Sequence, residues 1–201
     1  METVRTDILV IGSGAAGLLF ALKAADSADV LVITKKEAPL SNTNFAQGGV
    51  ATVIGEADSF ELHIGDTIAA GRGLCHEDAV EVMVREGPAR IRELLGIGVR
   101  FNRDEASGAL LLGSEGGHSA PRIVHFDDVT GREIEDKLVR SVLEHERIEI
   151  VENILAIDLV LADGAVRGVR ALDRTSGRMK TFLARHTVLA TGGAGKIYLY
   201  T

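Results

Sequence analysis

The chain has 201 residues, of which 46% are hydrophobic and 25% charged, and its formal net charge is −7 at pH 7. This balance is typical of a soluble globular chain with a sizeable core, and the negative charge disfavours nucleic acid or an anionic membrane as a partner. No apolar run approaches the roughly 20 residues of a membrane span. The single cysteine, Cys75, excludes an internal disulfide and is typical of a reducing compartment. We therefore expect a cytoplasmic protein without a membrane or nucleic-acid partner.

An apolar strand over residues 8–11 leads directly into a glycine-rich turn with the spacing Gly-x-Gly-x-x-Gly. In dinucleotide-binding folds Gly12 permits the tight turn, Gly14 lets a pyrophosphate approach the backbone, and Gly17 lets the next helix pack on the strand. A helix beginning at Ala15 points its unpaired N–H groups at the phosphates. The pattern predicts that the cofactor contacts Gly12, Ser13, Gly14, Ala15, Ala16 and Gly17.

The second apolar strand, over residues 30–33, ends without the acidic residue that usually holds a ribose hydroxyl. Thr34 and Lys35 stand there instead. A hydroxyl can still bond a ribose, and a lysine suits a ligand that bears phosphate. The pattern therefore disfavours NAD as the cofactor and remains compatible with FAD.

The segment over residues 39–51 is rich in glycine and small polar residues and carries no charge. Uncharged turn composition favours a buried loop whose amides face a ligand, and structureless loops of this length are uncommon unless they are functional. The alternative is a plain connection. The candidate cofactor contacts in this loop are Asn42, Thr43, Asn44, Phe45, Ala46, Gln47, Gly48 and Gly49.

Helical periodicity predicts helices over residues 58–70 and 77–86, a new helix opening at Pro88, and another starting at Thr130. Capping boxes mark two of these starts, Asp58 with Glu61 and Thr130 with Glu133. The last third changes to strands, over residues 148–151, 154–161, 166–172 and 179–183, separated by Asp-Gly and Ser-Gly turns. These strands predict a β-meander inserted before a final buried strand at 187–190.

That final strand ends in a second glycine-rich turn. A phosphate-binding P-loop would need a glycine where Ala190 stands and a hydroxyl where Ile197 stands. The nucleotide-triphosphatase interpretation therefore fails. The turn instead predicts another backbone approach to the same cofactor, through Thr191 and Gly192.

A loop over residues 112–122 places a carboxylate, an imidazole, a hydroxyl and a guanidinium close together between glycines. These groups belong to Glu115, His118, Ser119 and Arg122. Together these groups could bind a small anionic or zwitterionic substrate. A solvated loop with a satisfied histidine is the alternative, and spacing alone favours that alternative.

Several motifs in fixed order carry a resemblance. They are the glycine turn, Ser41-x-Thr43-x-x-Ala46-Gln47-Gly48-Gly49, Asp66-Thr67, Glu115-Gly-Gly-His-Ser, Thr130-Gly131 and Ala190-Thr-Gly-Gly. From residue 7 to residue 201 the chain resembles the flavoprotein family of succinate dehydrogenase, fumarate reductase and L-aspartate oxidase. The resemblance implies an α/β fold, a Rossmann-like FAD-binding domain of the glutathione-reductase type with a β-meander insertion. It also accounts for Thr34, since family members commonly carry a hydroxyl residue there.

Two positions indicate the branch of the family. Membrane-associated members carry a histidine that bonds FAD covalently where this chain has Asn42, so the resemblance implies non-covalent FAD. Glu115 stands where succinate-oxidising relatives usually carry glutamine, and the family assigns such a glutamate to the substrate ammonium, with His118 and Ser119 beside the substrate. An anion there favours aspartate over a purely dianionic dicarboxylate.

The implied reaction is flavin-dependent oxidation of L-aspartate to iminoaspartate, with oxygen or fumarate as acceptor, as the first step of de novo NAD biosynthesis. The alternatives are a soluble fumarate reductase or succinate dehydrogenase flavoprotein, and a catalytically inactive FAD-binding fragment.

The resemblance also implies that residues 1–201 are an incomplete FAD-binding domain, because the family's capping and C-terminal helical domains have no counterpart in this chain. The arginine that exchanges a proton with the substrate lies in those parts. The six histidines offer neither an oriented base nor a tetrahedral metal spacing. We therefore expect the 201-residue chain alone to be inactive and to hold no metal.

Overall fold

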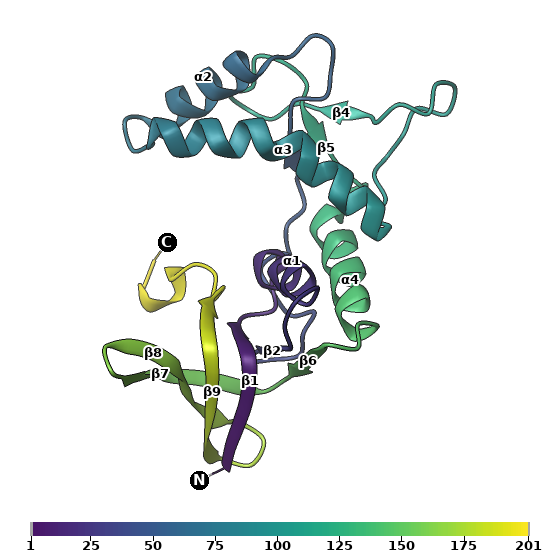
Figure 1. Cartoon of the computed structure of the whole chain (residues 1–201). Helices are drawn as coiled ribbons and strands as arrows, with labels where there is room; N and C mark the ends of the chain where they lie inside the picture. The colour runs from purple at the N-terminus through teal and green to yellow at the C-terminus, as the bar shows by residue number, and fades with distance from the viewer. Residues whose placement is uncertain (1, 201) are drawn as a thin grey trace. The chain divides into compact units, whose positions relative to one another are not determined.

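The computed structural model describes residues 2–200, with only the backbone of Lys196 (Figure 1). The chain divides into two compact units. Unit 1 comprises Met1–Asn44 and Glu135–Thr201, and unit 2 comprises Phe45–Ile134.

Unit 1 is built on a six-stranded mixed sheet in the order β6-β2-β1-β9-β8-β7. The strands are β1 (Glu2–Ile11), β2 (Val30–Ile33), β6 (Ile148–Val151), β7 (Ile154–Ala162), β8 (Ala165–Asp173) and β9 (Arg178–Leu189). The first four in the sheet order run parallel, and β9, β8 and β7 form antiparallel pairs. Helix α1 (Ala15–Ala24) connects β1 to β2, and a short 3-10 helix, η1 (Gly195–Ile197), follows β9. This arrangement confirms the predicted Rossmann-like α/β class.

The core of unit 1 lies on both faces of the sheet because side chains alternate along each strand. Leu9 and Ile11 of β1 pack on one face with Ile33 and with Phe182 of β9. Val10, between them in sequence, packs on the opposite face, in a cluster that includes residues of α1. A strand that is buried on both faces is continuously apolar, which is why residues 8–11 are easily recognised in the sequence.

The strand predictions for the last third need two corrections. The segments 179–183 and 187–190 are one continuous strand, β9, which pairs with β1 along its length and with β8. The meander therefore shares its third strand with the parallel sheet and does not precede a separate one. The segment 148–151 is not part of the meander, because β6 pairs in parallel with β2 at the other edge. The polar residues Arg185, His186 and Thr187 hid the continuity, since they interrupt the apolar pattern.

Unit 2 combines helices with a small antiparallel sheet in the order β3-β5-β4. Its strands are β3 (Val50–Ala51), β4 (Leu112–Gly113) and β5 (Ile123–Val124), and its helices are α2 (Phe60–Gly71) and α3 (Glu77–Ile97). Helix α4 (Thr130–Leu143) contributes its first residues, through Ile134, to unit 2 and the remainder to unit 1. Ile134, Leu138 and Val142 of α4 are buried, which confirms its predicted inner face.

The prediction of a new helix at Pro88 is wrong, because α3 continues through Pro88. An interior proline removes one backbone hydrogen bond and costs about 3 kcal/mol. The face that holds Val80, Val84 and Ile91 is buried on both sides of the proline. Burying each such side chain contributes roughly 1.5–3 kcal/mol, which outweighs the defect.

Neither predicted capping box forms. The N-cap of α2 is Ser59, whose side chain accepts a hydrogen bond from the Leu62 backbone N–H at 3.1 Å. At the start of α4, Thr130 Oγ1 accepts from the Phe126 N–H at 3.0 Å. Glu133 there pairs with Arg100 at 2.9 Å. Asp58 and Glu133 do not form the predicted caps because each carboxylate pairs with an arginine that is distant in sequence.

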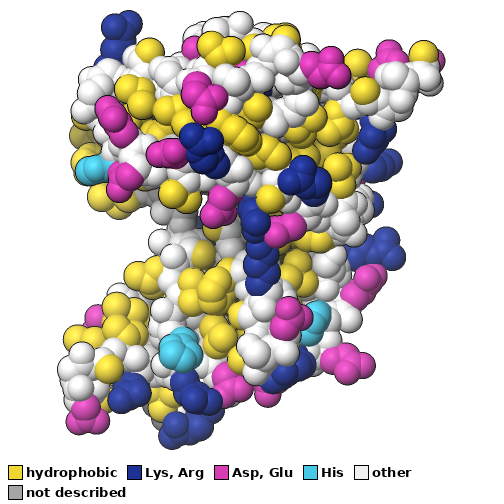
Figure 2. All heavy atoms as spheres, turned by 45° about the horizontal axis from the view of Figure 1, so that its top comes forward, with side chains coloured by type: hydrophobic (Ala, Val, Ile, Leu, Met, Phe, Trp, Pro, Cys, Tyr) yellow, Lys and Arg dark blue, Asp and Glu magenta, His cyan; other side chains and the backbone are white. Residues whose placement is uncertain are grey.

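Both charge signs are interspersed on the face of the molecule that Figure 2 shows. Such a surface generates no extended field of one sign there.

Candidate functional site

Three turns of unit 1 converge at the carboxyl ends of β1 and β9. A Cβ added to Gly12 would lie 2.2 Å from the Ala190 carbonyl oxygen, so the first and last turns touch. A Cβ on Gly14 would lie 3.5 Å from Thr43 Oγ1, and one on Gly192 would lie 3.9 Å from Asn42 Nδ2. The structure therefore brings together three of the segments that the sequence analysis selected as cofactor contacts. The carboxyl edge of parallel strands is where open α/β sheets bind nucleotides.

The N-terminus of α1 fits a pyrophosphate. Its N-cap residue, Gly14, has no side chain to cap the helix, and the first turn holds no acidic residue. The Ala15 N–H donates to Thr43 Oγ1 at 3.1 Å, which places a hydroxyl beside the helix end. Backbone N–H groups and the positive end of the helix dipole attract phosphate. Gly12 has φ +118° and Gly17 would place a Cβ 2.1 Å from the Gly12 oxygen, so both glycines are required by the turn itself.

Thr34 and Lys35 follow β2, as predicted. Thr34 is 7% exposed, and its hydroxyl shares a 3.1 Å hydrogen bond with that of Ser13, which also donates to the Ala38 carbonyl at 2.9 Å. Lys35 is exposed, and its carbonyl accepts from Arg174 at 2.6 Å. The side chains of Ser13 and Thr34 thus hold the turn, and contact of Thr34 with a ribose stays a prediction.

Glu135 is a buried acid that the sequence analysis missed. It lies on α4 within unit 1, and its side chain is fully buried. Burial raises the pKa of Glu135 to about 7, the Ser41 hydroxyl opposes that rise as a hydrogen-bond donor, and the Asp136 carboxylate adds to it. The helical pattern gave no signal for this burial because Glu135 precedes another acid in a charged stretch.

Unit 1 should lose stability as the pH rises through the pKa of Glu135. The folded pKa lies above the ordinary value of 4.5, so the stability is fully present below pH 4.5 and is lost as the pH approaches about 7. In Glu135→Gln the fall in unfolding free energy between pH 4 and pH 8 should be smaller by about 3 kcal/mol, at 1.36 kcal/mol per pKa unit. Urea unfolding across this range measures it, with Glu149→Gln, an exposed acid of β6, as the control. Parallel curves for wild type and Glu135→Gln would contradict the assignment.

The cofactor loop is less enclosed than its composition predicts. Phe45 is 70% exposed, and residues 46–49 are also exposed. The expectation of a buried loop is therefore wrong for this part. Its polar residues serve the turn itself: Ser41 Oγ accepts from the Thr43 N–H at 3.1 Å, and Asn44 Nδ2 donates to the Pro39 carbonyl at 2.7 Å. Turn formation explains the composition without burial.

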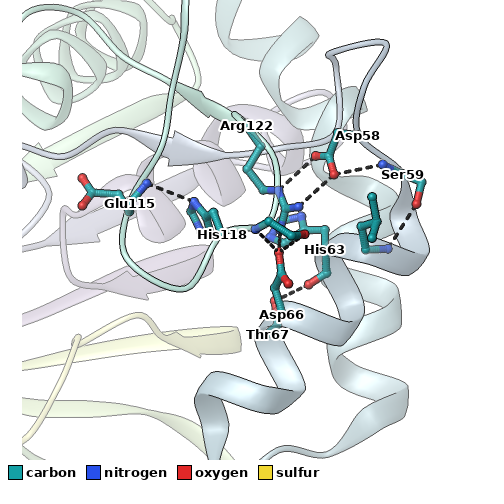
Figure 3. Close-up of polar contacts among 10 residues, drawn as sticks. Asp58, Ser59, His63, Asp66, Thr67, Glu115, His118 and Arg122 are labelled. Atoms are coloured by element: carbon teal, nitrogen blue, oxygen red, sulfur yellow. Dashed lines mark hydrogen bonds and ion pairs between the residues drawn. The ribbon is translucent and has the colours of Figure 1, made fainter.

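Glu115 and His118 lie in a tight turn of unit 2. The Glu115 N–H donates to His118 Nδ1 at 3.3 Å, and the His118 N–H donates to the Glu115 carbonyl at 3.1 Å. The Glu115 carboxylate is exposed and points away from the polar cluster of Figure 3. A Cβ on Gly48 would lie 3.2 Å from Glu115 Oε1, so the proposed substrate carboxylate adjoins the predicted cofactor loop within this unit.

The side chain of Arg122 holds this loop in place. Its side chain is fully buried, its Nε and Nη2 donate to the two carboxylate oxygens of Asp58 at 3.0 and 2.8 Å, and Nη1 donates to Asp66 Oδ2 at 2.8 Å (Figure 3). Ser119 donates to the same Asp66 oxygen through its N–H and its hydroxyl, each at 2.8 Å. These bonds from Ser119, followed by Arg122, lower the pKa of Asp66 and keep it ionised. Two acids of α2 and its N-terminal flank thus fix the loop through a bidentate, charge-assisted pair.

His63 completes this cluster on α2. It is 7% exposed, and its ring meets that of His118 edge to face, with centroids 6.3 Å apart. Burial, followed by the nearby Arg122 charge, lowers the pKa of His63 and favours the neutral ring. In the sequence Arg122 is recognisable only as a loop residue, and its partners Asp58 and Asp66 are not apparent. One signal was available: Arg122 directly precedes the apolar Ile123 and Val124, where an unpaired charge is disfavoured.

Within residues 2–200, no helix has the length and apolar character needed to cross a membrane. The same residues contain no group of three or more His, Cys, Asp or Glu side chains placed to hold a metal ion.

Residues 7–201 match the family model described as FAD binding domain. The chain is 48% identical over 96% of its length to "L-aspartate oxidase 2-a, chloroplastic" of Nicotiana tabacum and 45% identical over 97% to "L-aspartate oxidase 1" of Ralstonia nicotianae. It is similar to a solved quinol fumarate reductase of E. coli, with a TM-score of 0.93 and 33% identity over the whole chain. It spans 30%, 38% and 34% of these three proteins. With its three converging turns and a family match over nearly its whole length, the chain belongs to the FAD binding domain family, and its cofactor is FAD.

Proposed function

We propose that this chain is the FAD-binding part of an enzyme that oxidises L-aspartate to iminoaspartate. The observation that carries the proposal is Glu115, an exposed carboxylate in a glycine-rich turn directly beside Gly48 of the predicted cofactor loop. The names of the relatives from Nicotiana tabacum and Ralstonia nicotianae support the same reaction. FAD, when bound, supplies the acceptor for the hydride that leaves the substrate α-carbon.

The residues of this chain bind FAD and orient the substrate. The N-terminus of α1 and the Thr191–Gly192 turn hold the dinucleotide, and the Glu115 carboxylate pairs with the substrate ammonium. Arg122, with Asp58 and Asp66, keeps the loop of Glu115 and Ser119 in place. His118 and Ser119 complete the substrate side of this loop. An acid at Glu115 favours an amino dicarboxylate over succinate because it attracts the ammonium and repels carboxylates.

We assign both units to one FAD-binding domain over residues 1–201, and the chain spans 30% and 38% of the relatives from Nicotiana tabacum and Ralstonia nicotianae. Oxygen or fumarate is the proposed acceptor that reoxidises the flavin, and the reaction is proposed as the first step of de novo NAD biosynthesis. A cytoplasmic location is proposed for the enzyme.

A second candidate is a fumarate reductase or succinate dehydrogenase flavoprotein, favoured by the similarity to the E. coli quinol fumarate reductase. Reduction of the flavin by L-aspartate, and not by succinate, in the complete enzyme under anaerobic conditions supports the first proposal. Bleaching by succinate alone would establish the second. No reduction by either substrate, with FAD bound, would leave a catalytically inactive FAD-binding protein.

FAD should be held without a covalent bond. Asn42 has an amide where a covalent link needs a nucleophilic side chain, and it lies beside the Gly192 turn. Acid precipitation of the flavin-loaded protein should therefore release all the flavin into the supernatant, measured by its absorbance. Flavin that remains with the pellet would contradict this prediction.

Glu115→Gln in the complete enzyme should raise the KM for aspartate by about ten- to a hundredfold, because losing a charge-assisted contact costs roughly 1.5–3 kcal/mol. Fumarate reduction should change little, since fumarate carries no ammonium. Steady-state kinetics with both substrates measures the two effects. The control is Glu105→Gln, another exposed loop acid of unit 2. Equal loss of both activities would indicate a structural role for Glu115.

A further inference from the structure

The fully buried Glu135 has an unusual environment. Among the described residues, no partner bonds either carboxylate oxygen in good geometry, and the Ser41 hydroxyl is the side chain that approaches as a donor. A buried acid without partners is costly, and an apolar side chain of similar volume would pack there at lower cost. The stability of unit 1 therefore does not explain this glutamate.

Ser41 connects Glu135 to the cofactor loop. The Ser41 oxygen accepts hydrogen bonds from the backbone N–H groups of Thr43 at 3.1 Å and Asn44 at 3.4 Å. With its lone pairs used in this way, the hydroxyl still has one proton to donate. The fully buried Glu135 carboxylate, whose two oxygens have no hydrogen-bond partner among the described residues, is an acceptor that this proton could satisfy.

The turn that Ser41 closes lies against the start of α1. Thr43 Oγ1 accepts from the Ala15 N–H at 3.1 Å, and a Cβ on Gly14 would meet Thr43 Oγ1 at 3.5 Å and Ser41 Cβ at 3.9 Å. Ser41 and Thr43 thus line the open side of Gly14, where the pyrophosphate approaches. All of these contacts lie within unit 1.

We propose that Glu135 is a positioning residue for FAD, which holds the Ser41–Asn44 turn against the N-terminus of α1 by accepting the Ser41 hydroxyl. The proposal rests on FAD as the cofactor and does not depend on which substrate the enzyme oxidises. Glu135 touches no part of the ligand and acts through Ser41. An apolar residue would pack better and would leave the turn without its anchor.

The test separates FAD binding from folding in the complete enzyme. Glu135→Leu should weaken FAD binding by about tenfold or more, by fluorescence titration, while the melting temperature of the apoprotein stays the same or rises. Ser41→Ala should weaken binding to a similar extent, and the double variant should be no weaker than either single one. Glu135→Gln, whose amide oxygen still accepts, should bind within about threefold of the wild type. Glu149→Gln, an exposed acid of β6 in the same unit, is the control.

Three results would overturn the proposal. They are unchanged FAD affinity in Ser41→Ala, additive losses in the double variant, or binding by Glu135→Gln as weak as by Glu135→Leu.

Amide hydrogen exchange of the apoprotein supplies a readout that needs no ligand. Exchange at residues 15 and 43–44 should accelerate in Ser41→Ala and in Glu135→Leu, and unchanged exchange there would also overturn it. Failure of aspartate to reduce the flavin would affect only the proposed reaction.

Discussion

Replacing Arg122 with Met should lower the free energy of unfolding of unit 2 by about 3–5 kcal/mol, the usual cost of removing one partner of a buried ion pair. Arg122 is fully buried, and the side chain of Asp58 is only 1% exposed, so the substitution leaves a carboxylate without its cation. Asp66 loses its guanidinium partner as well and retains its hydrogen bonds from Ser119. The loop that carries Glu115 and His118 should consequently become mobile.

Denaturant unfolding followed by circular dichroism measures this loss, and hydrogen exchange assigns it to unit 2. Arg122→Lys should recover part of the stability, because it restores the charge without the bidentate fork. Adding Asp58→Asn to Arg122→Met should also recover part of it, because the stranded charge is removed. Arg85→Met, which breaks the exposed ion pairs of Arg85 with Glu81 and Glu61, is the control and should change little. A loss in Arg122→Met no greater than in this control would show that the buried network contributes nothing.

Alanine at Gly12 should lower stability, whereas alanine at Gly14 should weaken FAD binding, although the two glycines are close together in one motif. At Gly12 the added Cβ would lie 2.2 Å from the Ala190 oxygen, at φ +118°. Backbone strain and overpacking together should destabilise unit 1 by about 2–5 kcal/mol. At Gly14 the nearest atom to a Cβ is Thr43 Oγ1 at 3.5 Å, and φ is −75°. Gly14→Ala should therefore fold normally and bind FAD more weakly, because the methyl group occupies the path of the pyrophosphate.

Thermal unfolding of the apoprotein and FAD titration separate these two results. Gly65→Ala, on α2, is the control, since nothing lies within 4 Å of a Cβ there. Unchanged stability in Gly12→Ala would contradict the close approach of the first and last turns. Normal FAD affinity in Gly14→Ala would show that the pyrophosphate does not cross this glycine.

The sequence by itself determined the elements whose signal is local. Residues 8–17 combine a doubly buried strand, a turn that tolerates only glycine at two positions, and a helix start, and each of these is encoded in consecutive residues. The Asp163–Gly164 turn between β7 and β8 was equally predictable from the sequence. Both residues have positive φ, which aspartate and glycine accept. The family motifs around Asn42 and Glu115 were recognisable for the same reason.

Only the tertiary structure decided which side chains have distant partners. Asp58 and Glu133 look like helix caps in the sequence, yet each pairs with an arginine far along the chain. The continuity of β9 and the passage of α3 through Pro88 likewise depend on packing against other elements.

Glu135 is the clearest case. Nothing local distinguishes it from the exposed acid beside it, and its complete burial follows from the packing of α4 within the folded chain. Local backbone preferences act over a few residues, whereas burial and ion pairing depend on residues that meet only after the chain has folded.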